Sequence, residues 1–178
     1  MTIRPLALER ADEGTRAALE GVKRSLGMLP NLHAVLAHSP AALRSYLALS
    51  EQLGKGLLER KTRERIALAM AGANACDYCA SAHTLLGGKA GIAAEEMKNN
   101  LRGESDDPKS AAALDFVRRL VDGRGRVDDD SVPTLRRAGF ADGEIVEIVA
   151  HVAMNVLSNY LNHVAGTEID FPVVSSRA

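Results

Sequence analysis

Apolar residues recur three and four positions apart along almost the whole chain, and no segment alternates apolar and polar residues as a half-buried strand does. The pattern therefore predicts an all-α protein. Glycine, proline and polar residues separate the expected helical stretches, which span residues 15–27, 41–54, 57–73, 74–91, 93–101, 111–125, 130–139 and 142–166. Residues 30–40 are expected to form one or two helical turns, and residues 167–178 an irregular tail that packs across a neighbour.

Several helix ends carry recognisable cap residues. Ser39 is an expected N-cap followed by Pro40 at the first helical position, and Gly27 is expected to close the first helix. Asn74 is expected to cap the helix that follows it, and Asp142 the last one. The glycines of segment 87–91 are expected to end the helix that begins at Asn74.

The length of 178 residues predicts one domain. We divide it into an N-terminal helical extension (1–39), a core (40–125), and C-terminal helices with a tail (126–178). Hydrophobic residues make up 46% of the sequence but aromatic residues only 3%, so the core must consist mainly of aliphatic side chains and Met. Such small side chains favour closely packed helices.

Charge and hydropathy exclude several classes of partner and site. The formal charge of −1 comes from 22 basic and 23 acidic residues spread along the chain, which argues against binding nucleic acid or an anionic membrane. The first residues carry charges without the apolar core of a signal peptide, and no apolar run reaches the roughly 20 residues that span a bilayer. We therefore predict a cytoplasmic protein, where a close cysteine pair is more often catalytic or metal-binding than a permanent disulfide.

The only two cysteines lie in the stretch NACDYCASAH, residues 74–83. On a helix, Cys76, Cys79 and His83 fall within an arc of roughly 60°. The two sulfurs are spaced for a reversible disulfide, a position in the first turn favours thiolate at Cys76, and His83 can accept the Cys79 proton. Glu64, twelve residues before Cys76, reaches the same face if the chain bends near 72–74. Tyr78 adds a phenol between the cysteines.

Other interpretations of these residues remain open. The cysteines could be two small core groups, and Glu64 could be a solvated or ion-paired helix residue. A zinc site would need a fourth ligand beyond the two cysteines and His83, supplied by Glu64 or across a subunit interface. No organic cofactor is implied, because the chain has neither a G-x-G-x-x-G fingerprint nor a P-loop.

The remaining histidines are interpreted as structural residues: His33, His38, His151 and His163. His163 follows three asparagines whose amides are expected to bond to neighbouring helices or across an interface: Asn155, Asn159 and Asn162.

Glu64, Cys76, Cys79 and His83 in ERIALAMAGANACDYCASAH resemble the active-site signature of the alkyl hydroperoxidase D-like (AhpD-like) family, within the carboxymuconolactone decarboxylase superfamily. GMLPNLHAVLAHSPAAL and NVLSNYLNHVAGTEIDFP are similar to segments of its peroxidase-related members. The resemblance implies an AhpD-like helical bundle, and an alkyl hydroperoxide reductase-like peroxidase or disulfide oxidoreductase that assembles as a trimer or hexamer. Its substrate would be a small hydroperoxide, reduced at the expense of a dithiol or a protein reductant.

The resemblance also implies roles for the four residues. Cys79 would attack the peroxide and become a sulfenic acid, and Cys76 would condense with it to form the disulfide. His83 would assist deprotonation of Cys79, and Glu64 would join a proton relay through water. The best-known form of the family has a histidine where this chain has Tyr78, which is a poor base at neutral pH.

Two alternative functions are left open by the sequence. The chain could be a redox-responsive binding or stress protein whose disulfide alters an interface without turnover. It could also be an enzyme similar to γ-carboxymuconolactone decarboxylase, although that chemistry does not need a dithiol.

Overall fold

The computed structural model describes residues 2–177, which fold into nine α-helices and a short 3-10 helix, with no strand in that range. The all-α prediction is confirmed. In chain order the elements are η1 (Leu8–Arg10), α1 (Glu13–Leu26), α2 (Asn31–Leu36), α3 (Pro40–Gly54), α4 (Arg60–Ala73), α5 (Asp77–Lys89), α6 (Ala94–Leu101), α7 (Pro108–Asp122), α8 (Ser131–Arg137) and α9 (Asp142–Ala165).

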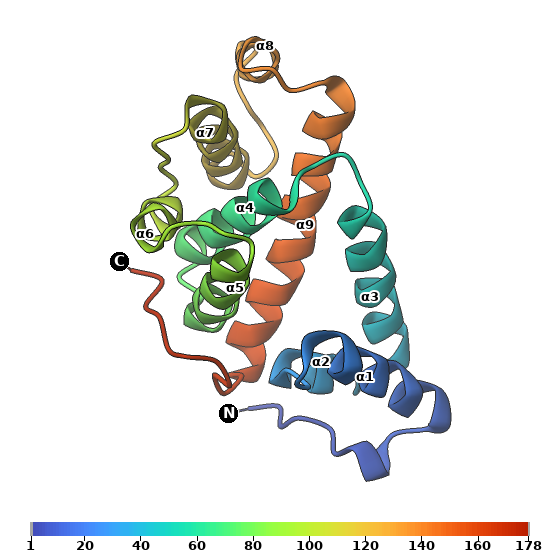
Figure 1. The fold of residues 1–178 in the computed structure, drawn as a ribbon. Helices are drawn as coiled ribbons and strands as arrows, with labels where there is room; N and C mark the ends of the chain where they lie inside the picture. The colour runs from blue at the N-terminus through green and yellow to red at the C-terminus, as the bar shows by residue number, and fades with distance from the viewer. Residues whose placement is uncertain (1, 178) are drawn as a thin grey trace.

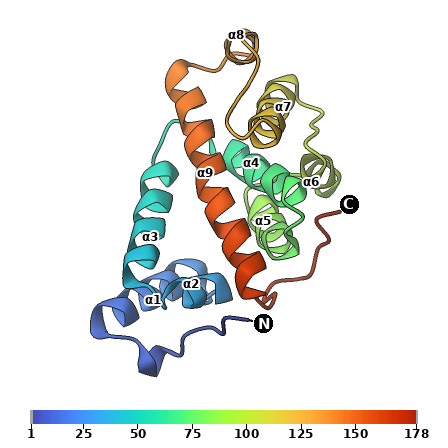
Figure 2. The same ribbon diagram turned by 180° about the vertical axis from the view of Figure 1, so that it is seen from behind.

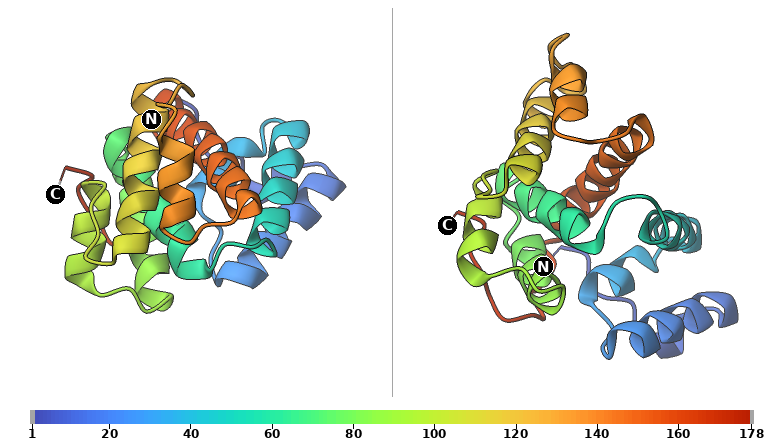
Figure 3. Two further views of the ribbon diagram at one scale, coloured as in Figure 1. Left: turned by 90° about the horizontal axis from the view of Figure 1, so that it is seen from above. Right: turned by 45° about the horizontal axis from the view of Figure 1, so that its top comes forward.

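The long helix α9 runs through the middle of the molecule (Figure 1). Helix α4 packs against α9 and also against α5, α6 and α7. Helices α1 to α3 lie on one side of α9 and α5 to α8 on the other, as the views in Figures 2 and 3 show. None of the described helices is both long and apolar enough to span a bilayer.

The predicted start of α3 and the predicted end of α1 are confirmed. The Ser39 hydroxyl accepts a hydrogen bond from the amide of Ala42 at 3.2 Å, and Pro40 is the first helical residue. Gly27 follows α1 with φ of +79°, a left-handed conformation that glycine adopts without strain. The sequence analysis did not identify Asp12, which caps α1 by accepting from the amide of Thr15 at 3.0 Å.

Other predicted helix ends were wrong. Asn74 does not cap α5 but follows the end of α4, because its side-chain amide donates to Asn159 Oδ1 on α9 at 2.8 Å. Cys76 is the N-cap residue of α5 instead. Asp142 does not cap α9 but pairs with Arg136 at 2.7 Å, and the helix begins after Ala141.

Helix α5 ends at Lys89, within the segment 87–91 predicted for its end. It includes Gly87 and Gly88, and the chain turns at Gly91, where φ is +81°. The side chain of Met97 packs against both Gly87 and Gly88, so these two glycines provide room for α6.

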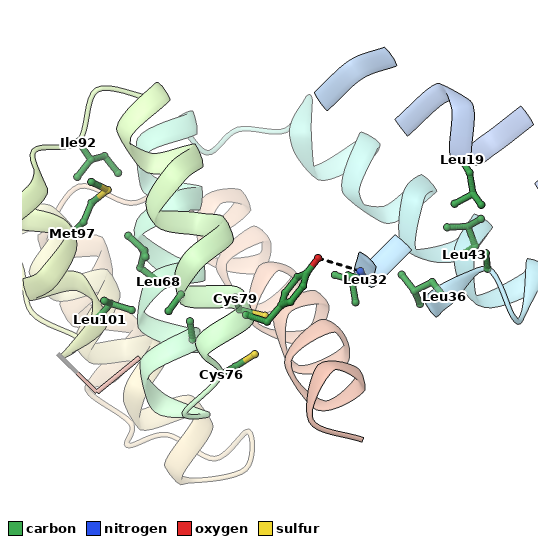
Figure 4. Close-up of a cluster of buried hydrophobic side chains, with 14 residues drawn as sticks. Leu19, Leu32, Leu36, Leu43, Leu68, Cys76, Cys79, Ile92, Met97 and Leu101 are labelled. Atoms are coloured by element: carbon green, nitrogen blue, oxygen red, sulfur yellow. Dashed lines mark hydrogen bonds between the residues drawn. The ribbon is translucent and has the colours of Figure 1, made fainter. Parts of the chain in front are cut away.

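The buried apolar residues form two clusters. One lies among α1 to α6 and the tail, and it contains Cys76, Tyr78 and Cys79 (Figure 4). The other lies mainly among α4, α7, α8 and α9. Gly72 allows α4 to approach the end of α6, because a Cβ atom at this position would collide with the carbonyl oxygen of Leu101.

The irregular tail packs on its own chain. The Asp170 carboxylate accepts a hydrogen bond from the amide of Asn31 at the start of α2, at 2.8 Å. The amide of Val174 donates to the Ser81 hydroxyl at 2.9 Å, and the amide and hydroxyl of Ser176 both donate to Asp77. The tail therefore joins α2 to the first turns of α5.

Candidate active site

The corner between α4 and α5 positions the two cysteines. Cys76 precedes the first residue of α5 and Cys79 lies in its first turn. Both are free thiols, with exposed fractions of only 1% and 3%. Figure 4 shows both sulfurs at this end of α5, pointing in the same direction. The geometry matches the prediction that they lie on a shared face.

The two thiols differ in charge. The Cys79 thiol and amide, which face the Cys76 sulfur, lower the pKa of Cys76 to about 6 despite its burial. The start of a helix adds to this effect, because its free N–H groups favour an anion. The adjacent Cys76 sulfur and burial raise the pKa of Cys79. The pair therefore releases one proton readily and retains the second, with the charge at Cys76.

Glu64 reaches α5 because α4 and α5 pack side by side after the corner. Its Oε2 atom lies 2.9 Å from His83 Nδ1 in a partly buried pair. Within residues 2–177 no hydrogen bond joins His83 to either sulfur. The structure thus brings the predicted acid and base together, one turn beyond Cys79, but does not place them in direct contact with the dithiol.

Helix α9 supplies polar groups from the opposite side. Asn162 Nδ2 donates to the sulfur of Cys79 at 3.2 Å, and Asn159 accepts from Asn74. His163 Nε2 lies 2.8 Å from the carbonyl oxygen of Asn74. Asn159 and Asn162 therefore bond to neighbouring elements, as the spacing predicted. The sequence analysis did not connect them with the cysteines.

Tyr78 holds α2 against α5. Its buried hydroxyl accepts a hydrogen bond from the amide of Leu32 at 3.1 Å, drawn as a dashed line in Figure 4. Its ring meets Phe171 edge-on, with centroids 5.5 Å apart. Burial raises the pKa of Tyr78 above its usual value, which makes it a still weaker base. Tyr78, the possible accessory residue of the site, therefore has the contacts of a structural residue that connects α2, α5 and the tail.

Two cavities flank His83. The first, about 220 Å³, has mainly apolar walls that include Leu32, Leu85 and Phe171. The second, about 270 Å³, includes Glu64 and His151. Five residues line both cavities: Leu26, His33, Tyr46, His83 and Leu86. A small organic molecule in either cavity would lie against His83.

Tyr46 is a site residue that the sequence analysis missed. It lines both cavities, and its ring meets His33 edge-on with centroids 5.8 Å apart. Burial raises the pKa of Tyr46 to about 12, so its hydroxyl keeps its proton at neutral pH. A single tyrosine on an amphipathic helix gave no signal for this position.

His151 is buried, His33 is half-buried, and both are neutral. Burial lowers the pKa of each to about 4. The Nδ1 atom of His33 and the Nε2 atom of His151 are buried without a hydrogen-bond partner. In the described part of the chain no group of three or more His, Cys, Asp and Glu side chains is arranged to hold a metal ion.

Comparisons with known proteins agree with the all-α fold. Residues 40–122 match the model of the carboxymuconolactone decarboxylase family. The fold is similar to that of an uncharacterized peroxidase-related protein from Ralstonia eutropha JMP134, described as an alkylhydroperoxidase AhpD core. That protein is 25% identical, the match covers 100% of this chain and 98% of that one, and the TM-score is 0.86. The whole chain therefore has the fold of this AhpD core, and its residues 40–122 are similar to the carboxymuconolactone decarboxylase family.

Two further solved structures share the fold. A peroxidase-related protein from Silicibacter sp. TM1040 is 23% identical over 94% of this chain and 92% of that one, with a TM-score of 0.82. A variant of the debrominase Bmp8 in complex with 2,3,4-tribromopyrrole is 19% identical over 96% of this chain and 92% of that one, with a TM-score of 0.81. The comparison with curated proteins gives no match.

The family match covers only part of the site. Glu64, the two cysteines and His83 lie within residues 40–122, whereas Asn159 and Asn162 lie outside them on α9.

Proposed function

We propose that this AhpD-like protein is a thiol-dependent peroxidase and disulfide oxidoreductase that works through Cys76 and Cys79. The observation that carries the proposal is a buried dithiol with one readily lost proton at the start of α5. The Glu64 and His83 pair beside it supports the proposal, because peroxide reduction requires proton transfer as well as a thiolate.

In the first step we assign the attack to Cys76, because it is the N-cap residue of α5, where free N–H groups favour a thiolate and its pKa is lowered. The Cys76 thiolate attacks the hydroperoxide, the O–O bond breaks, and the products are a sulfenic acid on Cys76 and an alkoxide. His83 lines both cavities and is paired with Glu64, so it is the group positioned to protonate the alkoxide.

In the second step the Cys79 sulfur attacks the sulfenic acid. The disulfide forms, and the hydroxyl group leaves as water with the Cys79 proton. An external dithiol then restores both thiols and is itself oxidised to a disulfide. The resemblance implies the reverse order, with attack by Cys79, and that assignment stays a prediction.

We infer that the substrate is an organic hydroperoxide. Its apolar group would occupy a cavity beside His83 while its O–O group reaches past the lining to the sulfurs, which line neither cavity. The cavity bordered by Leu32, Leu85 and Phe171 can bury an apolar group, whereas hydrogen peroxide offers none. The electron donor is a dithiol of a kind that the site geometry does not specify.

Replacement of each cysteine tests the proposal. Cys76→Ser is expected to abolish consumption of cumene hydroperoxide with excess dithiothreitol, because the thiolate is lost. Cys79→Ser is expected to accumulate a sulfenic acid on Cys76, which mass spectrometry would detect as a one-oxygen adduct or its dimedone derivative. His38→Gln is a control, because His38 contacts the carbonyl oxygen of Arg4 on the exposed surface.

Each other outcome points to a named alternative. A trapped adduct on Cys79 would restore the roles that the resemblance implies. A wild-type protein that oxidises once without repeated turnover would be a redox-responsive protein. Decarboxylation of a lactone that persists in both cysteine variants would identify a decarboxylase.

A further inference from the structure

Two buried amides on α9 face the dithiol. Asn162 is 5% exposed, and its Nδ2 atom donates to the sulfur of Cys79 at 3.2 Å. Asn159, one turn earlier, is fully buried. Both amides lower the pKa of Cys79, although Cys76 and burial raise it by more.

The orientation of Asn159 is fixed by Asn74. Asn159 Oδ1 accepts from the side chain of Asn74 at 2.8 Å, which leaves the Asn159 NH₂ group as the free end of the amide. That Nδ2 atom is buried and has no hydrogen-bond partner in the described chain. A buried donor without a partner destabilises the fold, so its presence beside a reactive sulfur requires a reason.

A sulfur that gains negative charge would supply the missing partner. Thiolates accept stronger hydrogen bonds than thiols do, because the donor then interacts with a full charge in a buried site of low dielectric constant. Asn162 lowers the pKa of Cys76 as well, but its hydrogen bond at 3.2 Å is to the sulfur of Cys79. Asn159 also acts on Cys79, so the two amides together are placed to stabilise charge on that sulfur.

We propose that Asn159 and Asn162 form an amide pair that stabilises the thiolate of Cys79 during the redox cycle. This inference rests on the proposed dithiol chemistry and assigns a role to α9 in it. When a reductant thiolate attacks the disulfide at Cys76, a mixed disulfide forms and the S–S bond breaks. The electron pair of that bond leaves on Cys79, where both amides donate to it.

The same amides act when Cys79 attacks the sulfenic acid on Cys76. The Cys79 proton must leave as its sulfur bonds to Cys76, and the two donors stabilise the charge that develops on the way. Cys79 is the leaving sulfur when the disulfide is reduced and the attacking sulfur when it forms. Stabilisation of its thiolate therefore affects the rate of both steps.

Titration of Cys79 alone tests the proposal without any substrate. In a Cys76→Ser background, the absorbance of Cys79 thiolate near 240 nm gives its pKa directly. Asn162→Leu removes the donor at similar volume, and Asn162→Asp keeps the shape but replaces the donor with a carboxylate. We expect each to raise the pKa of Cys79 by roughly one unit or more.

Asn155→Leu is the matched control. Asn155 is equally buried on the same helix, but its side chain donates to the carbonyl oxygen of His151. We expect this variant to leave the titration of Cys79 unchanged. Circular dichroism and thermal melting of every variant show whether the helices are retained.

Reduction of the disulfide provides the second measurement. In the chain with both cysteines, we expect Asn162→Leu to slow reduction by dithiothreitol roughly tenfold at neutral pH, in proportion to the poorer leaving thiolate. Folded Asn162 variants with an unchanged Cys79 pKa and an unchanged reduction rate would overturn the proposal. Neither measurement uses a hydroperoxide, so a protein that fails as a peroxidase still tests the amide pair.

Discussion

At the scale of single residues, the position of Cys76 decides the chemistry. It is the residue before the first helical residue of α5, where N–H groups of the first turn are free to face its sulfur. Cys79 lies within the helix, and its sulfur shares the proton that the pair retains. Two thiols three residues apart in the sequence therefore have different charges for a reason that is local to the helix end.

The pH dependence of alkylation tests this difference. Because the pKa of Cys76 is lowered to about 6, its thiolate is present above that pH and is lost as the pH falls through it. The rate of Cys76 carboxamidomethylation by iodoacetamide, followed by peptide mass mapping, should rise with a midpoint near pH 6 and level off by pH 7 to 8. In urea the midpoint should return to about 8.5, the ordinary value of cysteine. A native midpoint near 8.5 would contradict the assignment of the charge to Cys76.

The sequence predicted the residues of the site that are close to one another along the chain. Glu64 and His83 meet because two consecutive helices pack side by side, and this contact follows from one bend. Asn162 contacts Cys79 across 83 residues, so its role depends on how α9 crosses the molecule. Periodicity identifies the buried face of α9 but not the side chain that it meets. Tyr46 was missed because its place in the site likewise depends on how distant helices pack together.

At the scale of helices, local cap chemistry was predictable where no distant group competed for the cap. Ser39 and Pro40 begin α3 as their types suggest. Asn74 and Asp142 have good cap side chains as well, but Asn159 and Arg136 bind them instead. The sequence showed the capacity of each side chain to form a hydrogen bond and not the choice of partner.

Helix α4 depends on a glycine for its closest contact. In Gly72→Ala the new methyl group would meet the backbone carbonyl of Leu101, which cannot rotate away as a side chain can. We expect a loss of about 1–3 kcal/mol of unfolding free energy, measured by urea denaturation.

Gly54→Ala is the control for this substitution. A Cβ atom at Gly54, the last residue of α3, meets nothing within 4 Å, so this variant should be neutral or slightly more stable. Equal stability of the Gly72→Ala and Gly54→Ala variants would show that α6 moves freely away from α4.

At the scale of the whole molecule, one face of α9 remains apolar and exposed. Five large side chains lie along it: Val146, Val149, Leu157, Tyr160 and Val164, each between 42% and 68% exposed. Their spacing follows the helical repeat, so they form a stripe along most of the helix. Contiguous apolar surface of this kind is typical of protein contacts.

We propose that this stripe is the contact between copies of the chain, as the trimer or hexamer implied by the resemblance requires. Multi-angle light scattering should give a wild-type mass larger than that of a monomer. The double substitution Val146→Glu and Leu157→Glu should reduce it to the monomer, because buried carboxylates without partners are unfavourable. Val173→Glu, at an exposed apolar residue of the tail, should not change the mass. A wild-type monomer would refute the proposal.

The near-complete burial of both sulfurs also restricts which molecules can exchange electrons with them. With exposed fractions of 1% and 3%, the two cysteines lie within a packed cluster of side chains, so other side chains cover their sulfurs. A folded redox partner that brings its own thiol to the outer surface contacts the covering side chains before it reaches the sulfurs. A large electron carrier must therefore displace the covering side chains, whereas a compact one has only to diffuse inward, and the packing thus discriminates among donors by size.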